Sequence, residues 1–352
     1  MTRIVFHDFD EFADSIRGIA GRFVPTARSE NDWWVDVATL GRIDLQQLQI
    51  GAAATYAGDG TSNTLTLGIP MSDPKRIRID GHALEDNSLI YLKHDQPFTF
   101  AARETTRWAG VTIPLRDETH GMFDTEHVMA SLDPGTRAQS NANSLDRLRQ
   151  LIARITNEDA MIGFLEPAAA NAAEEDVLAA VLQTIDASSA SRERHVGRPQ
   201  VPRDRVIADT LELIEAKHGQ PLFIDDLCRA TSVSERTLRN VFHEYFGVGP
   251  MRLLKVRQLL EIRRALLVAD PARDTVAKIA ARFGVWDFSL FARNYKALYG
   301  ESPSESLRRP PKSADPFDVS WIACAARRFT HFDPGPSDPT RHTQCAPTSS
   351  RA

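Results

Sequence analysis

Short alternating runs of hydrophobic residues fill the first third of the chain. Between residues 33 and 113 apolar positions recur at every second residue, and Gly, Pro, Asp or Asn bounds each run, as in 65–69. Period-two runs of this length predict half-buried β-strands, and six to eight of them are typical of a β-sandwich or small barrel. Within 42–50 the apolar phase shifts by one residue across Gln46 and Gln47, which predicts a β-bulge.

After about residue 140 the apolar period becomes that of a helix. Apolar residues follow a 3-4-3 spacing from Leu145 to Ile155 and line one helical face from Val177 to Ile185. Such a helical pair either packs on the strands of its own chain or forms the surface of a homodimer through residues 143–187. The sequence leaves both alternatives open.

Two segments lack any apolar period. Residues 188–202 concentrate Ser, Arg and Pro, and we expect them to form a linker between a domain at 1–187 and one at 203–309. Residues 310–352 are rich in Pro and Ser, which predicts a largely disordered tail. Trp321, Ile322 and Phe329 are its apolar residues with the capacity to dock elsewhere.

Residues 203–309 predict an all-α domain with two helix-turn-helix units. In the first, a short helix and a three-residue turn precede a helix that Ser234 caps and that ends near Phe246. Its outer face carries Arg236, Arg239 and Asn240. A helix of about 18 residues then begins at Pro250, and at ~1.5 Å per residue it spans roughly 27 Å.

The second unit repeats this order. Thr275 caps its first helix, Gly284 makes the turn, and Asp287 caps a helix that runs to about Tyr299. The period assigns Leu290, Phe291, Tyr295 and Leu298 to its inner face, and Phe288, Ser289, Arg293 and Lys296 to its outer face. A rod of this length lets two such outer helices enter successive major grooves, about 34 Å apart on one face of a duplex.

Charge is distributed unevenly along the chain. The net charge is −5, but residues 1–199 hold 19 Lys and Arg against 29 Asp and Glu, whereas residues 200–309 hold 18 against 14. A basic carboxyl-terminal region beside an acidic amino-terminal one fits a polyanion-binding module joined to a different domain. Acidic residues interrupt any signal-peptide core, and no apolar run approaches 18 residues, so we expect no membrane segment. Three widely spaced cysteines favour the cytoplasm.

The stretches SVSERTLRNVFHEYFGVGPMRLLKVRQL and TVAKIAARFGVWDFSLFARNYKALYGESPSESLR carry a family resemblance. Region 203–309 resembles the AraC/XylS-type DNA-binding domain of transcription regulators. The resemblance implies base reading by Arg236, Arg239 and Asn240 in the first unit and by Ser289 and Arg293 in the second. Arg suits guanine and Asn suits adenine in the major groove. Weaker DNA-contact candidates are Phe288, which offers only apolar contact such as to a thymine methyl, and Lys255, Arg257 and Lys296.

The sequence departs from this family at two positions of the first unit. Phe223 occupies the place of the usual Ser or Thr cap, and Ser232 the place where Gly often makes the turn. We therefore expect the first unit to be less rigid than the second.

The resemblance also implies a ligand-sensing or dimerising domain ahead of the readers, often a cupin-like barrel. More loosely, DFDEFADSIRG and the Ile77–Leu84 run are similar to ethanolamine-operon-type regulators. The aromatic candidates for an effector pocket are Trp33, Trp34, Tyr91, Phe98, Phe100 and Trp108. No cofactor or metal is expected, because His82, His94, His120 and His127 form no H-x-H pair and no phosphate-binding or nucleophile motif is present.

The sequence therefore predicts a two-domain α+β protein: a β-sandwich or cupin-like barrel with a helical pair, then a double helix-turn-helix domain. Its expected function is sequence-specific transcription regulation without enzymatic activity. The expected partners are promoter DNA, RNA polymerase and a small-molecule effector. The alternatives are a barrel enzyme with a DNA-binding appendage and an effector-independent dimeric DNA-binding protein.

Overall fold

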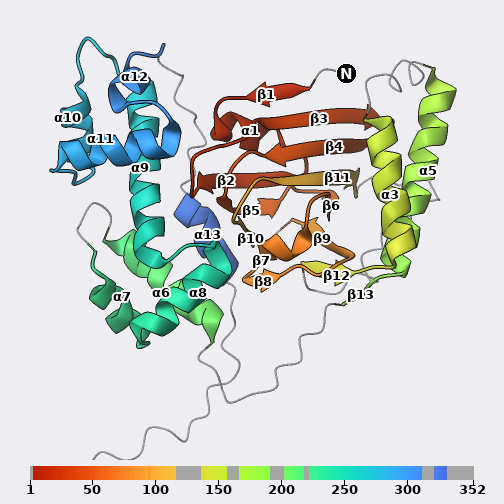
Figure 1. Cartoon of the computed structure of the whole chain (residues 1–352). Coiled ribbons are helices and arrows are strands. Elements are labelled where there is room, and N and C mark those ends of the chain that lie inside the picture. Colours follow the sequence, from red (N-terminus) through yellow and green to blue (C-terminus); the bar gives the residue numbers. More distant parts are fainter. Residues whose placement is uncertain are drawn as a thin grey trace, which may run out of the picture.

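The computed structural model describes residues 3–94, 96–115, 136–156, 166–190, 202–217, 222–310 and 321–330. A β-rich domain occupies the amino-terminal half and a helical region follows it, as the sequence predicts (Figure 1). The fold class is therefore confirmed at the level of a two-domain α+β protein.

Two antiparallel β-sheets form the amino-terminal domain. The larger has the order β1-β3-β4-β11-β6-β9-β12-β13. Its strands are β1 (Ile4–Phe6), β3 (Trp33–Leu40), β4 (Ile43–Ile50), β11 (Thr106–Pro114), β6 (Thr64–Pro70), β9 (Ser88–Lys93), β12 (Arg137–Gln139) and β13 (Ser189–Ala190). The smaller has the order β2-β5-β10-β7-β8. Its strands are β2 (Ile19–Pro25), β5 (Ala54–Gly60), β10 (Phe98–Ala102), β7 (Ile77–Ile79) and β8 (His82–Ala83).

The bulge predicted in 42–50 is wrong. Strand β4 pairs residue for residue with β3 on one side and β11 on the other. The apolar phase shifts because different faces are buried in the two halves of the strand. Ile43 and Leu45 join the core beneath the helical pair, whereas Leu48 and Ile50 join the core between the two sheets.

The helical pair packs within the chain. Helices α3 (Ala142–Ile155) and α5 (Pro167–Asp186) cover the outer face of the larger sheet (Figure 1). Their apolar residues, including Leu148 and Val181, are fully buried against strand residues such as Leu67. Of the two alternatives that the period left open, intramolecular packing accounts for these side chains. A homodimer through residues 143–187 stays a prediction, and only the outer faces of this pair remain for it.

The remaining helices begin with α1 in the β-rich domain and continue through the carboxyl-terminal region. They are α1 (Phe9–Ser15), the 3-10 helix η1 (Pro74–Arg76), α6 (Arg203–Ala216), α7 (Ile224–Thr231), α8 (Glu235–Phe246), α9 (Pro250–Val268), α10 (Val276–Arg282), α11 (Phe288–Tyr299), α12 (Pro303–Leu307) and α13 (Trp321–Thr330). In Figure 1, α9 runs between a group formed by α6, α7 and α8 and a group formed by α10, α11 and α12.

Residues 321–330 depart from the prediction of a largely disordered tail, because they form α13. This helix lies between the smaller sheet and α6 (Figure 1). Trp321, Cys324 and Ala325 are 3% exposed or less, and the Trp321 ring meets Phe246 edge-on at a centroid distance of 5.2 Å. The Ala-rich sequence favours a helix, and the dock buries its apolar face.

Ion pairs hold the far end of α13 to both domains. The Arg328 guanidinium lies 3.2 Å from Asp80 of the β-rich domain and 3.8 Å from Asp204 of α6. Asp80 also accepts hydrogen bonds from the backbone N–H of Thr99 and the hydroxyl of Thr136. Helix α13 is thus an interdomain wedge: it packs between the two domains through buried apolar residues near its start and through the ion pairs of Arg328 near its end.

This packing predicts the effect of truncating Trp321. The substitution Trp321→Ala removes a buried aromatic ring from the domain boundary and is expected to lower the free energy of unfolding by about 3 kcal/mol. Urea unfolding measures the change. Trp286→Ala is the matched control: because Trp286 is 79% exposed, its loss should change stability by less than about 0.5 kcal/mol. Equal stability of the two variants would contradict the wedge.

Candidate nucleic-acid interface

Helix α8 presents a polar outer face in the first helix-turn-helix unit. The Ser234 hydroxyl accepts a hydrogen bond from the Thr237 N–H at 3.2 Å and so caps the helix, as predicted. Leu238, Val241 and Phe242 are buried in the unit. The predicted readers lie on the opposite face and are exposed: Arg236, Arg239 and Asn240.

Arg239 is not a free cation on this face. Its guanidinium pairs with Glu235 one turn earlier, and the two side chains are 61% and 47% exposed. A pair as exposed as this contributes about 0–1 kcal/mol. Its rupture therefore costs little if Arg239 turns toward a base or phosphate.

The two departures in the first unit have different structural consequences. Phe223 caps nothing with its side chain and is 65% exposed, but the Asp226 carboxylate accepts a hydrogen bond from the Phe223 N–H at 3.0 Å. Ser232 adopts a left-handed backbone with φ of 54°. A side chain in this region costs roughly 1–2 kcal/mol relative to glycine. The turn at Ser232 is therefore strained, whereas Asp226 partly replaces the cap that the side chain of Phe223 does not provide.

Helix α11 is the counterpart in the second unit. The Asp287 carboxylate accepts a hydrogen bond from the Leu290 N–H at 2.8 Å. Phe291, Tyr295 and Leu298 form the inner face, and their exposed fractions are 9% or less. The predicted outer residues are exposed: Phe288, Ser289, Arg293 and Lys296.

Leu290 is a correction to the predicted inner face of α11. Its side chain is 42% exposed. Neighbouring residues are 100° apart around a helix, so Leu290 does not share the inner face of the buried Phe291 and Tyr295.

Helix α9 connects the two units. Its 19 residues from Pro250 to Val268 span about 28 Å at ~1.5 Å per residue, in agreement with the predicted rod. Of the weaker candidates on this helix, Arg257 has a side chain only 13% exposed and pairs with Glu261 at 2.8 Å. Lys255 is half-buried and donates a hydrogen bond to Gln258 at 3.4 Å. Both lie on the connecting helix and not on the outer face of α8 or α11.

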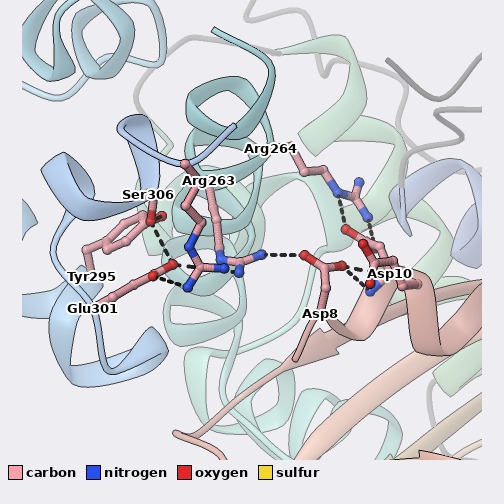
Figure 2. A network of polar contacts seen from close by, with 9 residues as sticks. Asp8, Asp10, Arg263, Arg264, Tyr295, Glu301 and Ser306 are labelled. Carbon is pink, nitrogen blue, oxygen red and sulfur yellow. Dashed lines mark hydrogen bonds and ion pairs between the residues drawn. The ribbon is translucent and has the colours of Figure 1, made fainter. Parts of the chain in front are cut away.

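A buried ion pair joins α9 to the β-rich domain. Arg263 and Asp8 are 3.0 Å apart, and their side chains are 4% and 7% exposed (Figure 2). The other carboxylate oxygen of Asp8 accepts hydrogen bonds from the Asp10 and Glu11 N–H groups and so caps α1. Next to this pair, Arg264 contacts Asp10 at 2.6 Å. The start of α1 is therefore fixed to the rod by two arginines.

The same network continues from Arg263 to the second reader helix. Arg263 lies 3.7 Å from Glu301, which accepts a hydrogen bond from the Ser306 hydroxyl, and Ser306 is 2.8 Å from the Tyr295 hydroxyl of α11 (Figure 2). Burial raises the pKa of Tyr295 to about 12, so the phenol stays protonated at neutral pH. A continuous polar path thus runs from α1 to α11.

A cleft of about 280 Å³ opens beside this network, between the β-rich domain and the second unit. Its lining includes Phe6, Arg28, Trp33, Arg263 and Tyr299. Among the residues that the structure describes, the Arg263 Nε and the Tyr299 hydroxyl are buried without a hydrogen-bond partner. Burial raises the pKa of Tyr299 well above its usual range, so this hydroxyl is a donor. Both residues line the cleft, although these two atoms are themselves shielded from solvent.

A second, apolar cavity of about 70 Å³ lies between the two sheets. Three of the predicted pocket aromatics line it: Phe98, Phe100 and Trp108. The others are dispersed, since Trp33 lines the larger cleft, Trp34 stacks under Arg3 at 3.8 Å, and Tyr91 faces the helical pair. The sequence grouped these six residues only as a class of aromatic strand residues.

Two absences hold for the described ranges. No group of three His, Cys, Asp or Glu side chains there has the geometry to hold a metal ion. His120 and His127 lie outside those ranges. None of the helices in the same ranges has the length and apolar content to cross a membrane.

Two helix-turn-helix units joined by one connecting helix pack against a domain of two β-sheets. This combination defines a class of two-domain proteins with a double helix-turn-helix region. Family models match both parts: "AraC-binding-like domain" matches residues 21–183, and "Helix-turn-helix domain" matches residues 227–309. Together they cover more than half of the chain. The chain belongs to the AraC family of regulators.

Relatives support this membership. Over 114 residues the chain is 38% identical to a probable thc operon regulatory protein of Rhodococcus erythropolis, covering 32% of this chain and 34% of that protein. Over 139 residues it is 29% identical to the XylDLEGF operon transcriptional activator of Pseudomonas putida, covering 39% and 41%. The chain thus matches well under half the length of these relatives.

Among solved structures, an apo form of a ToxT variant from Vibrio cholerae aligns over 76% of this chain and 97% of its own. The identity is 12% and the TM-score 0.27. Similarity at this level establishes no shared ligand.

The buried pair at the domain boundary predicts a stability effect. Asp8→Asn keeps the size and capping oxygen of the side chain but removes its charge, which leaves the cation of Arg263 with only the more distant Glu301. We expect a loss of about 3 kcal/mol in the free energy of unfolding, measured in urea. Asp44→Asn, which removes a surface partner of Arg17, is the control and should cost below about 1 kcal/mol. Similar losses from both would show that the boundary pair has no special weight.

Proposed function

We propose that this chain is a sequence-specific DNA-binding transcription regulator whose amino-terminal domain responds to a small molecule. The observation that carries the proposal is the pair of exposed outer faces on α8 and α11. They present Arg236, Arg239 and Asn240 on one helix and Ser289 and Arg293 on the other. Arginine and asparagine make the bidentate contacts that distinguish guanine and adenine in the major groove.

The length of α9 supports a bipartite DNA site. A rod of about 28 Å separates the two units and brings them near the ~34 Å repeat of the major groove. Contacts to phosphate, including those of Lys296, are expected to dominate affinity and make it strongly dependent on salt. We further propose that the regulator acts on promoter DNA with RNA polymerase in the cytoplasm.

We infer that the effector occupies the cleft between the β-rich domain and the second unit. Its volume of about 280 Å³ approaches the lower limit of common ligand pockets, whereas the cavity of about 70 Å³ has room for about two water molecules. An effector in this cleft would lie between Phe6 and Trp33 of the β-rich domain and Arg263 and Tyr299 of the helical region. Such an occupant contacts both domains, so its binding can change how the readers are held.

Selection from a random duplex library tests the DNA-binding proposal. The full chain should enrich one sequence with two short elements about one helical turn apart. Enrichment of no sequence would contradict the proposed function. Enrichment of a single element would contradict reading by the first unit.

Arg293→Ala tests the second reader. If Arg293 contacts a base, its loss should cost about 1–3 kcal/mol of binding and relax the preference at one base pair of the selected site. Fluorescence anisotropy with single-base variants of the site measures both effects. Arg107→Ala, an exposed arginine on β11 of the β-rich domain, is the control and should leave affinity unchanged. A uniform loss across all sequences would assign Arg293 to phosphate instead.

A further inference from the structure

The two reader helices differ in the chemistry of their outer faces. On α8 the exposed side chains are polar or charged, and none of the large hydrophobic residues with high exposure belongs to it. At the start of the second unit's reader, three such residues occur within five positions. Trp286 is 79%, Phe288 41% and Leu290 42% exposed.

Helical geometry sets two of these side chains on either side of a polar stripe. Ser289, Arg293 and Lys296 follow i, i+4 and i+7 spacing and share one line along α11. At 100° per residue, Phe288 lies on one flank of this line and Leu290 on the other. Trp286 stands just before the cap Asp287. The cationic stripe is therefore bordered by apolar surface.

The three exposed apolar side chains do not pack into the core of the second unit. The inner face of α11 is already occupied by Phe291, Tyr295 and Leu298. Trp286 is the most exposed large hydrophobic residue of the described ranges, and no ring contact of Trp286 or Phe288 occurs there. Clustered apolar exposure of this kind marks a surface that binds something.

The charges around the cluster indicate what covers it. Arg293 and Lys296 on the same helix attract a polyanion and bring the outer face of α11 against a duplex. In the major groove the one apolar group that a base pair presents is the C5-methyl of thymine. An apolar border beside a cationic stripe thus matches a groove in which methyl groups lie near phosphates.

We propose that Trp286, Phe288 and Leu290 add a preference for thymine to the half-site of the second unit by packing on thymine methyl groups. The first unit then reads its half-site by hydrogen bonds through Arg236, Arg239 and Asn240, whereas the second adds apolar contacts to the reading by Ser289 and Arg293. This proposal rests on the proposed DNA-binding function and assigns unlike half-sites to the two units.

Replacing thymine by uracil tests the proposal, because uracil lacks the C5-methyl and keeps every hydrogen-bonding group. The full chain is titrated with the selected duplex after substitution in one half-site at a time. The half-site of the second unit is the one whose preference Arg293→Ala relaxes. Uracil there should weaken binding about fourfold per contacted methyl, from the transfer free energy of one buried methyl group, whereas uracil in the other half-site should have no effect.

Two variants sharpen the assignment. Phe288→Ala and Leu290→Ala should each bind the thymine duplex more weakly and lose much of the difference between thymine and uracil. Met251→Ala is the matched control, because Met251 is 41% exposed on α9 and outside both readers. It should keep the full difference. Since all three side chains are exposed, the variants should fold like the wild-type chain, which circular dichroism checks.

The failures of the two proposals are distinguishable. Equal affinity of the wild-type chain for thymine and uracil duplexes, or a second half-site without thymine, overturns methyl reading and leaves DNA binding intact. Variants that bind duplex normally but reduce transcription would assign the cluster to a protein partner, which also overturns it. Failure to bind any duplex removes the proposed function and this inference with it.

Discussion

The pairing of Arg263 with Asp8 is the interaction on which the arrangement of the domains depends. A guanidinium that is 4% exposed requires a charged partner within the protein, because an unpaired charge there is strongly destabilising. Asp8 provides that partner and at the same time caps α1. The carboxylate of Asp8 therefore fixes the connecting helix α9 to α1, the first helix of the β-rich domain. The same carboxylate supports both the domain contact and the start of α1.

The contacts at this boundary reach both units. Glu301, Ser306 and Tyr295 extend the network of Arg263 to the core of the second reader (Figure 2). On the other side, α13 fills the space between the smaller sheet and the first unit, where Trp321 packs on Phe246. A change in the β-rich domain can therefore act on either reader through contacts that already exist.

The sequence predicted what local chemistry determines. Ser234 and Asp287 were identified as caps because hydroxyl and carboxylate side chains satisfy the free N–H groups at helix starts, and both fulfil that role. The bulge predicted in 42–50 and the inner position predicted for Leu290 were wrong, because both depend on which partner covers each face of the element. The pair between Arg263 and Asp8 joins residues 255 positions apart, and no local pattern indicates it. Trp321 was identified as a residue able to dock, but its site between the smaller sheet and α6 could not be predicted, for the same reason.

Hydroxyl-radical footprinting of the full chain on its selected duplex tests most directly that two readers on one rod engage one face of DNA. We expect two protected segments whose centres lie about 10 base pairs apart on the same face of the duplex. Substitutions in α8 should remove one segment and those in α11 the other. A single protected segment, or two on opposite faces, would contradict reading by both units on one face of the duplex.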